Sequence, residues 1–110
     1  MSIYKAPSIE QQPYVNLTSW RVFRTPEGDC HFCGRHARQG DGRVSSKIVS
    51  FDKDQMIGVT RSGRIYHLVG DMGANSDAQC VASAWMQYNG IDPATVEYVD
   101  PRNTNVVKED

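Results

Sequence analysis

The chain has 110 residues and a formal net charge of −1, with 39% apolar and 23% charged side chains. This length predicts one domain that can bury a core without disulfides or metal, and the composition excludes a low-complexity or fibrous chain. No apolar run approaches the ~20 residues of a transmembrane helix. The first 14 residues lack the apolar stretch of a secretory signal, and three cysteines argue against a secreted disulfide framework. We therefore expect a location in the cytoplasm.

Charge is distributed unevenly along the chain. Residues 21–64 hold nine basic and five acidic side chains, a net charge of +4, whereas the other residues hold three basic and eight acidic ones, a net charge of −5. This division is compatible with a sheet that has a positive field and an acidic C-terminal part, and the simpler interpretation is an ordinary solvated surface.

The N-terminal part predicts an arm followed by a hairpin. Residues 1–16 contain two prolines and few periodic apolar positions, which is typical of a flexible arm. Alternating side chains indicate a strand from Trp20 to Thr25, and the turn sequence PEGD follows. A returning strand is expected from Cys30 to Ala37, before a second turn with the sequence RQGDG.

Residues 42–70 predict three further strands joined by tight turns. β-Branched and aromatic residues fill this segment, and DKDQ and RSGR supply the turn residues. Together with the first two strands, they predict a five-strand antiparallel meander. An open sheet and a small, curled SH3-like barrel are both compatible with this pattern.

The apolar period changes after Val69 to that of a helix. A capping-box sequence begins at Ser76, and Gly90 supplies a stop, so we predict one amphipathic helix of about 13–14 residues. A turn or short helix is expected at residues 92–93, and an edge strand at residues 96–99. The helix should pack on the sheet with Trp85 as its large apolar plug. The expected core contains Val22, Ile48, Val59, Ile65, Val81 and Trp85.

The predicted fold class is therefore α+β, a five-strand antiparallel meander packed by one amphipathic helix in the C-terminal half. Residues 1–16 form the arm, residues 17–102 a single domain, and residues 103–110 an acidic tail.

The sharpest local motif is C-x-x-C-G, which begins at Cys30 and includes Cys33. Two thiolates with two further ligands from His36, His67 and Cys80 would form a tetrahedral zinc site. A second ligand pair at matching spacing is missing, and two residues three apart on a strand point to opposite faces. We predict no metal and no cofactor. Zinc bound by Cys30, Cys33, His36 and Cys80 is the alternative.

The sequence contains no catalytic signature. A glycine-rich phosphate loop, G-x-S-x-G and H-E-x-x-H are all missing from it. The spacing of cysteines and histidines does not favour a Cys–His nucleophile either. We predict that the protein is not an enzyme.

Basic side chains near the third turn are candidates for partner binding. Arg61 and Arg64 flank Ser-Gly at a hairpin tip, where guanidinium groups would project and reach carboxylates or phosphates. Arg43 and Lys47 on the preceding strand complete the expected set. A charged hairpin end that only keeps the protein soluble is the simpler interpretation. A nucleic-acid surface is another, with His31, Phe32, Tyr66 and His67 as stacking platforms.

Residues 42–70, followed by SDAQCVASAWMQYNG, resemble small proteins encoded in proteobacterial genomes, phages and prophages, generally of unassigned function. The resemblance covers roughly residues 19–99, and its most specific part is GVTRSGR at residues 58–64, continued by Tyr66, Leu68 and Gly70. The C-x-x-C motif is not part of the shared pattern. The resemblance implies a mobile genetic element, and it supplies no catalytic residues to assign to this chain.

This context implies a protein that acts by occupying a host macromolecule. The specific expectation is an anti-CRISPR-like inhibitor of a host defence complex in the bacterial cytoplasm, by analogy of size and context. A nucleic-acid-binding module and a zinc-stabilised adaptor are the alternatives. The partner is therefore expected to be a host protein or nucleoprotein complex.

Overall fold

A computed structural model of the chain describes residues 10–73 and 76–108. Within these ranges one sheet of six strands is accompanied by one α-helix and one 3₁₀-helix. The elements are β1 (Tyr14–Arg24), β2 (Cys30–His36), β3 (Gly42–Asp52), β4 (Ile57–Thr60), β5 (Ile65–Leu68), α1 (Ser76–Tyr88), η1 (Pro93–Thr95) and β6 (Glu97–Val99). The predicted α+β class, the five consecutive strands and the single helix are confirmed.

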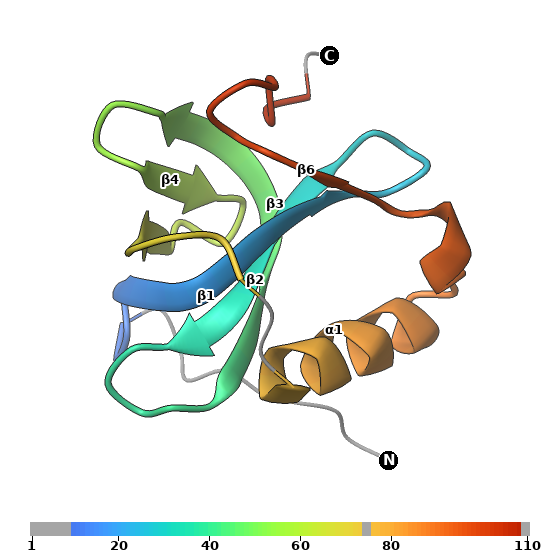
Figure 1. The fold of residues 1–110 in the computed structure, drawn as a ribbon, viewed down its shortest axis with the longest axis horizontal. Helices are drawn as coiled ribbons and strands as arrows, with labels where there is room; N and C mark the ends of the chain where they lie inside the picture. The colour runs from blue at the N-terminus through green and yellow to red at the C-terminus, as the bar shows by residue number, and fades with distance from the viewer. Residues whose placement is uncertain (1–9, 74–75, 109–110) are drawn as a thin grey trace.

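The five strands β1–β5 form a closed ring of pairings (Figure 1). Each consecutive pair is antiparallel, as the meander predicts. The ring closes where Tyr14–Leu17 of β1 pairs in parallel with Ile65–Leu68 of β5, and β6 pairs with the other end of β1. The sheet is therefore mixed: the consecutive strands of the predicted meander are antiparallel, and the pair β1–β5 that closes the ring is parallel.

A bulge bends β1 at its centre. The register of β1 against β2 shifts between Thr18 and Arg21, and Ser19 has a positive φ of 46°. A Cβ atom on Gly34, in the facing strand, would lie 3.0 Å from the Cα atom of Trp20. The bulge places one extra residue in β1 and so interrupts the alternation of side chains. As a result Leu17 and Trp20, three residues apart, both point to the inner face. Glycine at position 34 lets the two backbones approach at the bend.

The ring encloses an apolar core. Trp20 is fully buried there, and its indole Nε1 donates a hydrogen bond to the carbonyl oxygen of Gly70 at 3.1 Å. The Phe32 ring packs against the rings of Tyr66 and Phe51, with centroids 5.5 and 6.0 Å apart. The core residues are Val15, Leu17, Trp20, Val22, Cys30, Phe32, Ile48, Tyr66, Leu68, Val99 and Val106.

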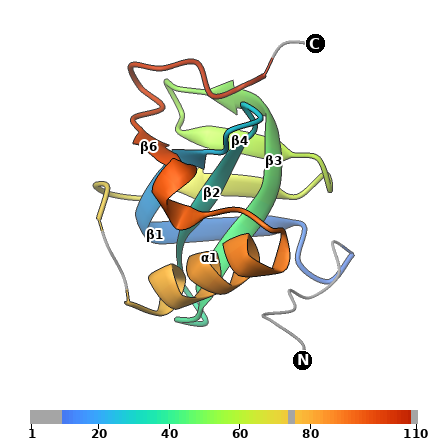
Figure 2. The same cartoon turned by 90° about the vertical axis from the view of Figure 1, so that its right-hand side faces the viewer.

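Helix α1 covers the outer face of β2 and β3 (Figure 2). Ala82 and Met86, four residues apart on one helix face, are buried against Phe23 and Cys33. Trp85 is only half-buried, so it lies at the edge of the contact between helix and sheet and not, as expected, at its centre. The fully buried tryptophan is Trp20. Of the expected core residues, Val22 and Ile48 are buried, and Val59, Ile65, Val81 and Trp85 are half-buried.

Both ends of the domain are held more closely than the sequence predicts. Strand β1 begins at Tyr14, and the carbonyl oxygen of Pro13 accepts a hydrogen bond from the Ile65 amide at 2.9 Å. Residues 14–16 of the expected arm are therefore strand, whereas residues 1–9 lie outside the described residues. In the expected acidic tail, Val106 is 2% exposed and belongs to the core. Val107 is half-buried against the same core, so the tail contributes packing through both valines.

Replacing Gly58 with alanine should destabilise the fold. A Cβ atom there would lie 2.4 Å from Cζ of Phe32, whose fully buried ring has no space to move into. We expect the free energy of unfolding in urea to fall by about 1–3 kcal/mol. In a Phe32→Leu background the added methyl group should cost less, because the smaller side chain leaves room. Equal costs in both backgrounds would contradict this packing.

Candidate functional site

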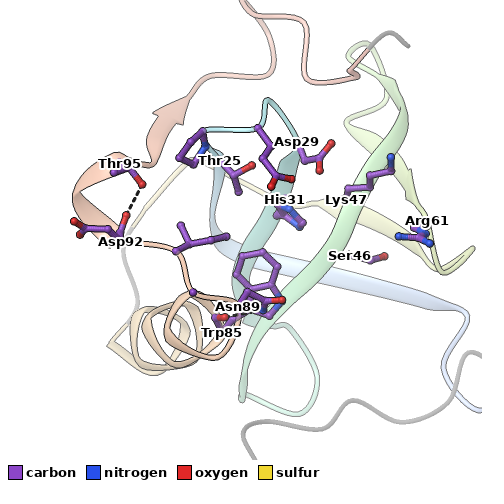
Figure 3. Close-up of a pocket in the computed structure, with 14 residues that line it drawn as sticks. Thr25, Asp29, His31, Ser46, Lys47, Arg61, Trp85, Asn89, Asp92 and Thr95 are labelled. Carbon is purple, nitrogen blue, oxygen red and sulfur yellow. Dashed lines mark hydrogen bonds between the residues drawn. The ribbon is translucent and has the colours of Figure 1, made fainter.

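A cleft of about 730 Å³ opens between the C-terminal end of α1 and the sheet (Figure 3). This size lies within the range of ligand-binding pockets, roughly 300–1,000 Å³. The lining comes from the end of α1 and the loop after it, from η1, from β2 and β3, and from the β1–β2 and β4–β5 turns. The cleft thus exists only when these distant segments are folded together.

His31 of β2 lies among the labelled lining residues of Figure 3 and is only 6% exposed. Its Nδ1 atom lies 2.9 Å from the carbonyl oxygen of Ser45. A carbonyl oxygen can only accept, so neutral His31 carries its proton on Nδ1 and has a lone pair on Nε2. Burial lowers the pKa of His31, whereas the Ser45 carbonyl and Asp29 act in the opposite direction. The ring is therefore neutral at pH 7.

Two aromatic rings fix the orientation of His31. Phe23 stacks on the imidazole with ring centroids 5.3 Å apart, and Trp85 of α1 lies on it at 4.5 Å. Phe23 and Trp85 also contact each other edge to face at 5.7 Å. Because Trp85 is half-buried and lines the cleft, this cluster supplies an apolar wall beside a rigidly held imidazole.

Two basic side chains stand together on another wall. Lys47 of β3 faces His31 in the strand pairing, and Arg61 begins the β4–β5 turn. The Arg61 amide donates a hydrogen bond to the Lys47 carbonyl oxygen at 2.8 Å, and the Ser62 amide donates to Ser46 Oγ at 3.1 Å. The turn is thereby attached to β3. Within residues 10–73 and 76–108, neither basic head group forms an ion pair.

Three carboxylates line the cleft from the other elements. Glu27 and Asp29 come from the β1–β2 turn, and Asp92 precedes η1 (Figure 3). Asp92 accepts a hydrogen bond from the Ala94 amide at 3.0 Å and so caps η1. Asp29 Oδ1 lies 3.9 Å from Nζ of Lys108, a distance that is too long for a hydrogen bond. The lining therefore carries both signs of charge, on different elements.

This arrangement is suited to binding. No described side chain in the cleft pairs a nucleophile with His31 at hydrogen-bond distance, and Nδ1 of the imidazole bonds the carbonyl oxygen of Ser45. The described residues also hold no group of three or more His, Cys, Asp and Glu side chains that could coordinate a metal ion. What the cleft offers a ligand is an aromatic wall, two cations without ion-pair partners and three carboxylates.

The structure separates the four expected partner-binding residues into two pairs. Lys47 and Arg61 line the cleft together. Arg43 is 1% exposed and Arg64 7%, so the expectation that Arg64 projects from the hairpin tip was wrong. The reason is that both guanidinium groups hold the segment before β1: Arg43 donates to the side-chain oxygen of Gln12 at 2.7 Å, and Arg64 donates to its carbonyl oxygen at 2.8 Å.

The zinc alternative gains no geometric support from the described side chains. Cys30 lies in the core of the ring, whereas Cys33 lies under α1 on the opposite face of β2. Burial raises the pKa of the Cys33 thiol to about 11, which disfavours a thiolate ligand. His36 accepts hydrogen bonds on Nδ1 from two backbone amides at 3.0 and 3.2 Å. The side chain of Cys80 lies outside the described residues.

Sequence reasoning did not identify the acidic residues or Trp85 as parts of a site. Glu27 and Asp29 read as turn residues, and Asp92 as a helix cap, which are roles they also have. One partial signal was the β2–β3 turn, which brings His31 close to residues 46 and 47, but the pairing of His31 with Lys47 also depends on a register shift between His31 and Cys33. The position of α1 relative to these strands depends on packing and was not available from local patterns.

Comparisons of the chain with protein-family models, with curated proteins and with solved structures found no significant match. The resemblance to phage and prophage proteins therefore stays a prediction. None of the helical segments among the described residues has the length and apolar character required to cross a bilayer.

The lowered pKa of His31 predicts a pH-dependent stability. The unfolded chain binds a proton at His31 more readily than the folded chain does. The contribution of neutral His31 to the free energy of unfolding is therefore complete above about pH 6.5 and is lost as the pH falls toward the folded-state pKa. Urea unfolding between about pH 7.5 and 5 should show a smaller decrease for His31→Asn, whose amide still has a donor for Ser45. An unchanged decrease would exclude His31 as a source.

Arg43 and Arg61 should respond differently to truncation. Arg43→Ala removes a buried guanidinium that bonds Asp41, Gln12 and Gln39, and it should lower the free energy of unfolding by about 3 kcal/mol. Arg61→Ala, at an exposed position, should change it by about 0.5 kcal/mol or less. Chemical denaturation of both variants measures this difference. Similar losses would mean that Arg61 is structural as well.

Proposed function

We propose that this protein is a non-catalytic binding protein whose cleft holds a segment of a partner protein. The observation that carries the proposal is the pair Lys47 and Arg61, which have no ion-pair partner among the described residues and stand beside the aromatic wall of His31 and Trp85. Aromatic surface supplies apolar contact area, and two neighbouring cations can bind one carboxylate between them.

A protein segment fits this cleft better than a nucleic acid does. A phosphate backbone that crossed the cleft would meet Glu27, Asp29 and Asp92 as well as the two cations. Two of the nine basic side chains of residues 21–64, Arg43 and Arg64, are also buried and used internally. The proposed stacking platforms Phe32 and Tyr66 are inside the ring. These features favour a partner with charges of both signs.

The narrower function, an anti-CRISPR-like inhibitor of a defence complex in the bacterial cytoplasm, rests on the resemblance of residues 19–99. It is a special case of the same proposal, because such an inhibitor acts by occupying a surface of its target. A zinc-stabilised adaptor is the weaker candidate, since Cys30 and Cys33 belong to different clusters.

Selection of peptides tests the cleft. A random dodecapeptide display library selected on the whole protein should yield binders that Asn89→Trp abolishes, because the indole would fill the cleft. Asn89→Ala loses the same side-chain hydrogen bond to the Trp85 carbonyl but leaves the cleft open, so it should keep binding. Gln87 is exposed in the last turn of α1 and does not line the cleft, so Gln87→Trp should also keep binding. Failure to enrich peptides, or enrichment that Asn89→Trp does not affect, would overturn the proposal.

A further inference from the structure

We propose that the cleft selects a dipolar segment, in which a carboxylate side chain binds Lys47 and Arg61 and a basic side chain binds the carboxylates of Glu27, Asp29 and Asp92. The inference rests on the proposed function and adds the chemical class and orientation of the ligand. It follows from how the charges are divided among the elements that form the cleft.

The basic side of the cleft is built on the β3–β4–β5 part of the ring. Lys47 and Arg61 are connected by the hydrogen bond between their main chains, so their side chains start from adjacent positions. Figure 3 shows both on the same side of His31. Lys47 is half-buried and Arg61 is exposed. A single carboxylate placed between the two cations would interact with both of them.

The acidic side is built on different elements. Asp92 lies across the cleft from Arg61 in Figure 3, next to Thr95 of η1, and Asp29 lies on the β1–β2 turn. The Asp29 atom Oδ1 has no hydrogen-bond donor in the described residues, and Lys108 approaches it only to 3.9 Å. Because Asp29 Oδ1 is buried beside Lys108, a ligand ammonium or guanidinium group would find the exposed carboxylates of Glu27 and Asp92 most accessible.

His31 and Trp85 lie between Asp92 and the two cations in Figure 3. The buried imidazole is neutral at pH 7, and oppositely charged groups influence it, since Asp29 raises the pKa of His31 and Lys47 lowers it. The Trp85 ring beside it offers an apolar surface. The aliphatic stems of a long acidic or basic side chain can pack on such a surface while their charged ends reach opposite walls. A ligand with one sign of charge would match one wall and be repelled by the other.

The charge pattern of the selected peptides tests this inference. Dodecapeptides enriched on the wild-type protein should contain one acidic and one basic residue at a constant spacing. Replacing the acidic residue of such a peptide with its amide should weaken binding about tenfold. The same replacement should have little effect on the variant Lys47→Glu/Arg61→Glu, which should instead prefer a lysine at that peptide position.

A matched variant controls for net charge. Arg38→Glu/Lys53→Glu makes the same change in net charge at exposed positions outside this cleft and should bind the wild-type peptides normally. Glu27→Gln/Asp29→Asn should weaken binding of peptides that keep their basic residue. It should not weaken binding of peptides in which that residue is replaced by glutamine.

The outcomes separate this inference from the proposed function. Peptides that Asn89→Trp excludes but that carry no fixed charge pair, or that bind the charge-reversed variant equally well, would leave the binding function intact and overturn the dipolar ligand. No peptide binding at all would overturn both proposals. A fluorescent single-stranded oligonucleotide that bound the cleft more tightly than any peptide would also overturn both.

Discussion

Strand β1 takes part in three pairings, and the rest of the structure depends on its bend at Ser19. One edge of β1 pairs with β2, whereas the other pairs with β5 at residues 14–17 and with β6 at residues 22–24. The bulge lies between these two segments and separates the part that closes the ring from the part that carries β6. In a meander of five strands the first and the last run in the same direction, so a ring that joins them needs one parallel pair.

The alternation of side chains on β1 and β2 connects this ring to the candidate site. Val22 and Phe32 point into the ring, whereas Phe23 and Cys33 point outward and are covered by α1. His31 pairs with Phe23 in register and therefore faces the helix side as well. Two packed layers thus share the same two strands, and the cleft lies where α1 ends and leaves the outer layer open.

Local patterns predicted the elements well because each pattern reports on its own segment. The Ser76 capping box and Gly90 mark a helix whose observed bounds are Ser76–Tyr88, and apolar alternation with turn residues marks each strand. Contacts between segments that are far apart in the sequence could not be predicted from such local patterns. Nothing local distinguishes the buried Trp20 from the half-buried Trp85, since the burial of Trp20 depends on a bulge and on ring closure.

Two of the four expected binding residues, Lys47 and Arg61, line the cleft, and the other two do not because their positions depend on long-range contacts. Arg61 and Arg64 flank one turn and have the same chemistry, yet Arg64 is buried and donates to the main chain of Gln12, 52 residues earlier, whereas Arg61 is exposed. Which of the two cations is available to a partner therefore depends on where the N-terminal segment crosses the ring. The same crossing uses Arg43, which leaves Lys47 as the cation of β3 that lines the cleft. Because the ring closure uses two of the four expected cations internally, it also determines the charge that the cleft presents to a ligand.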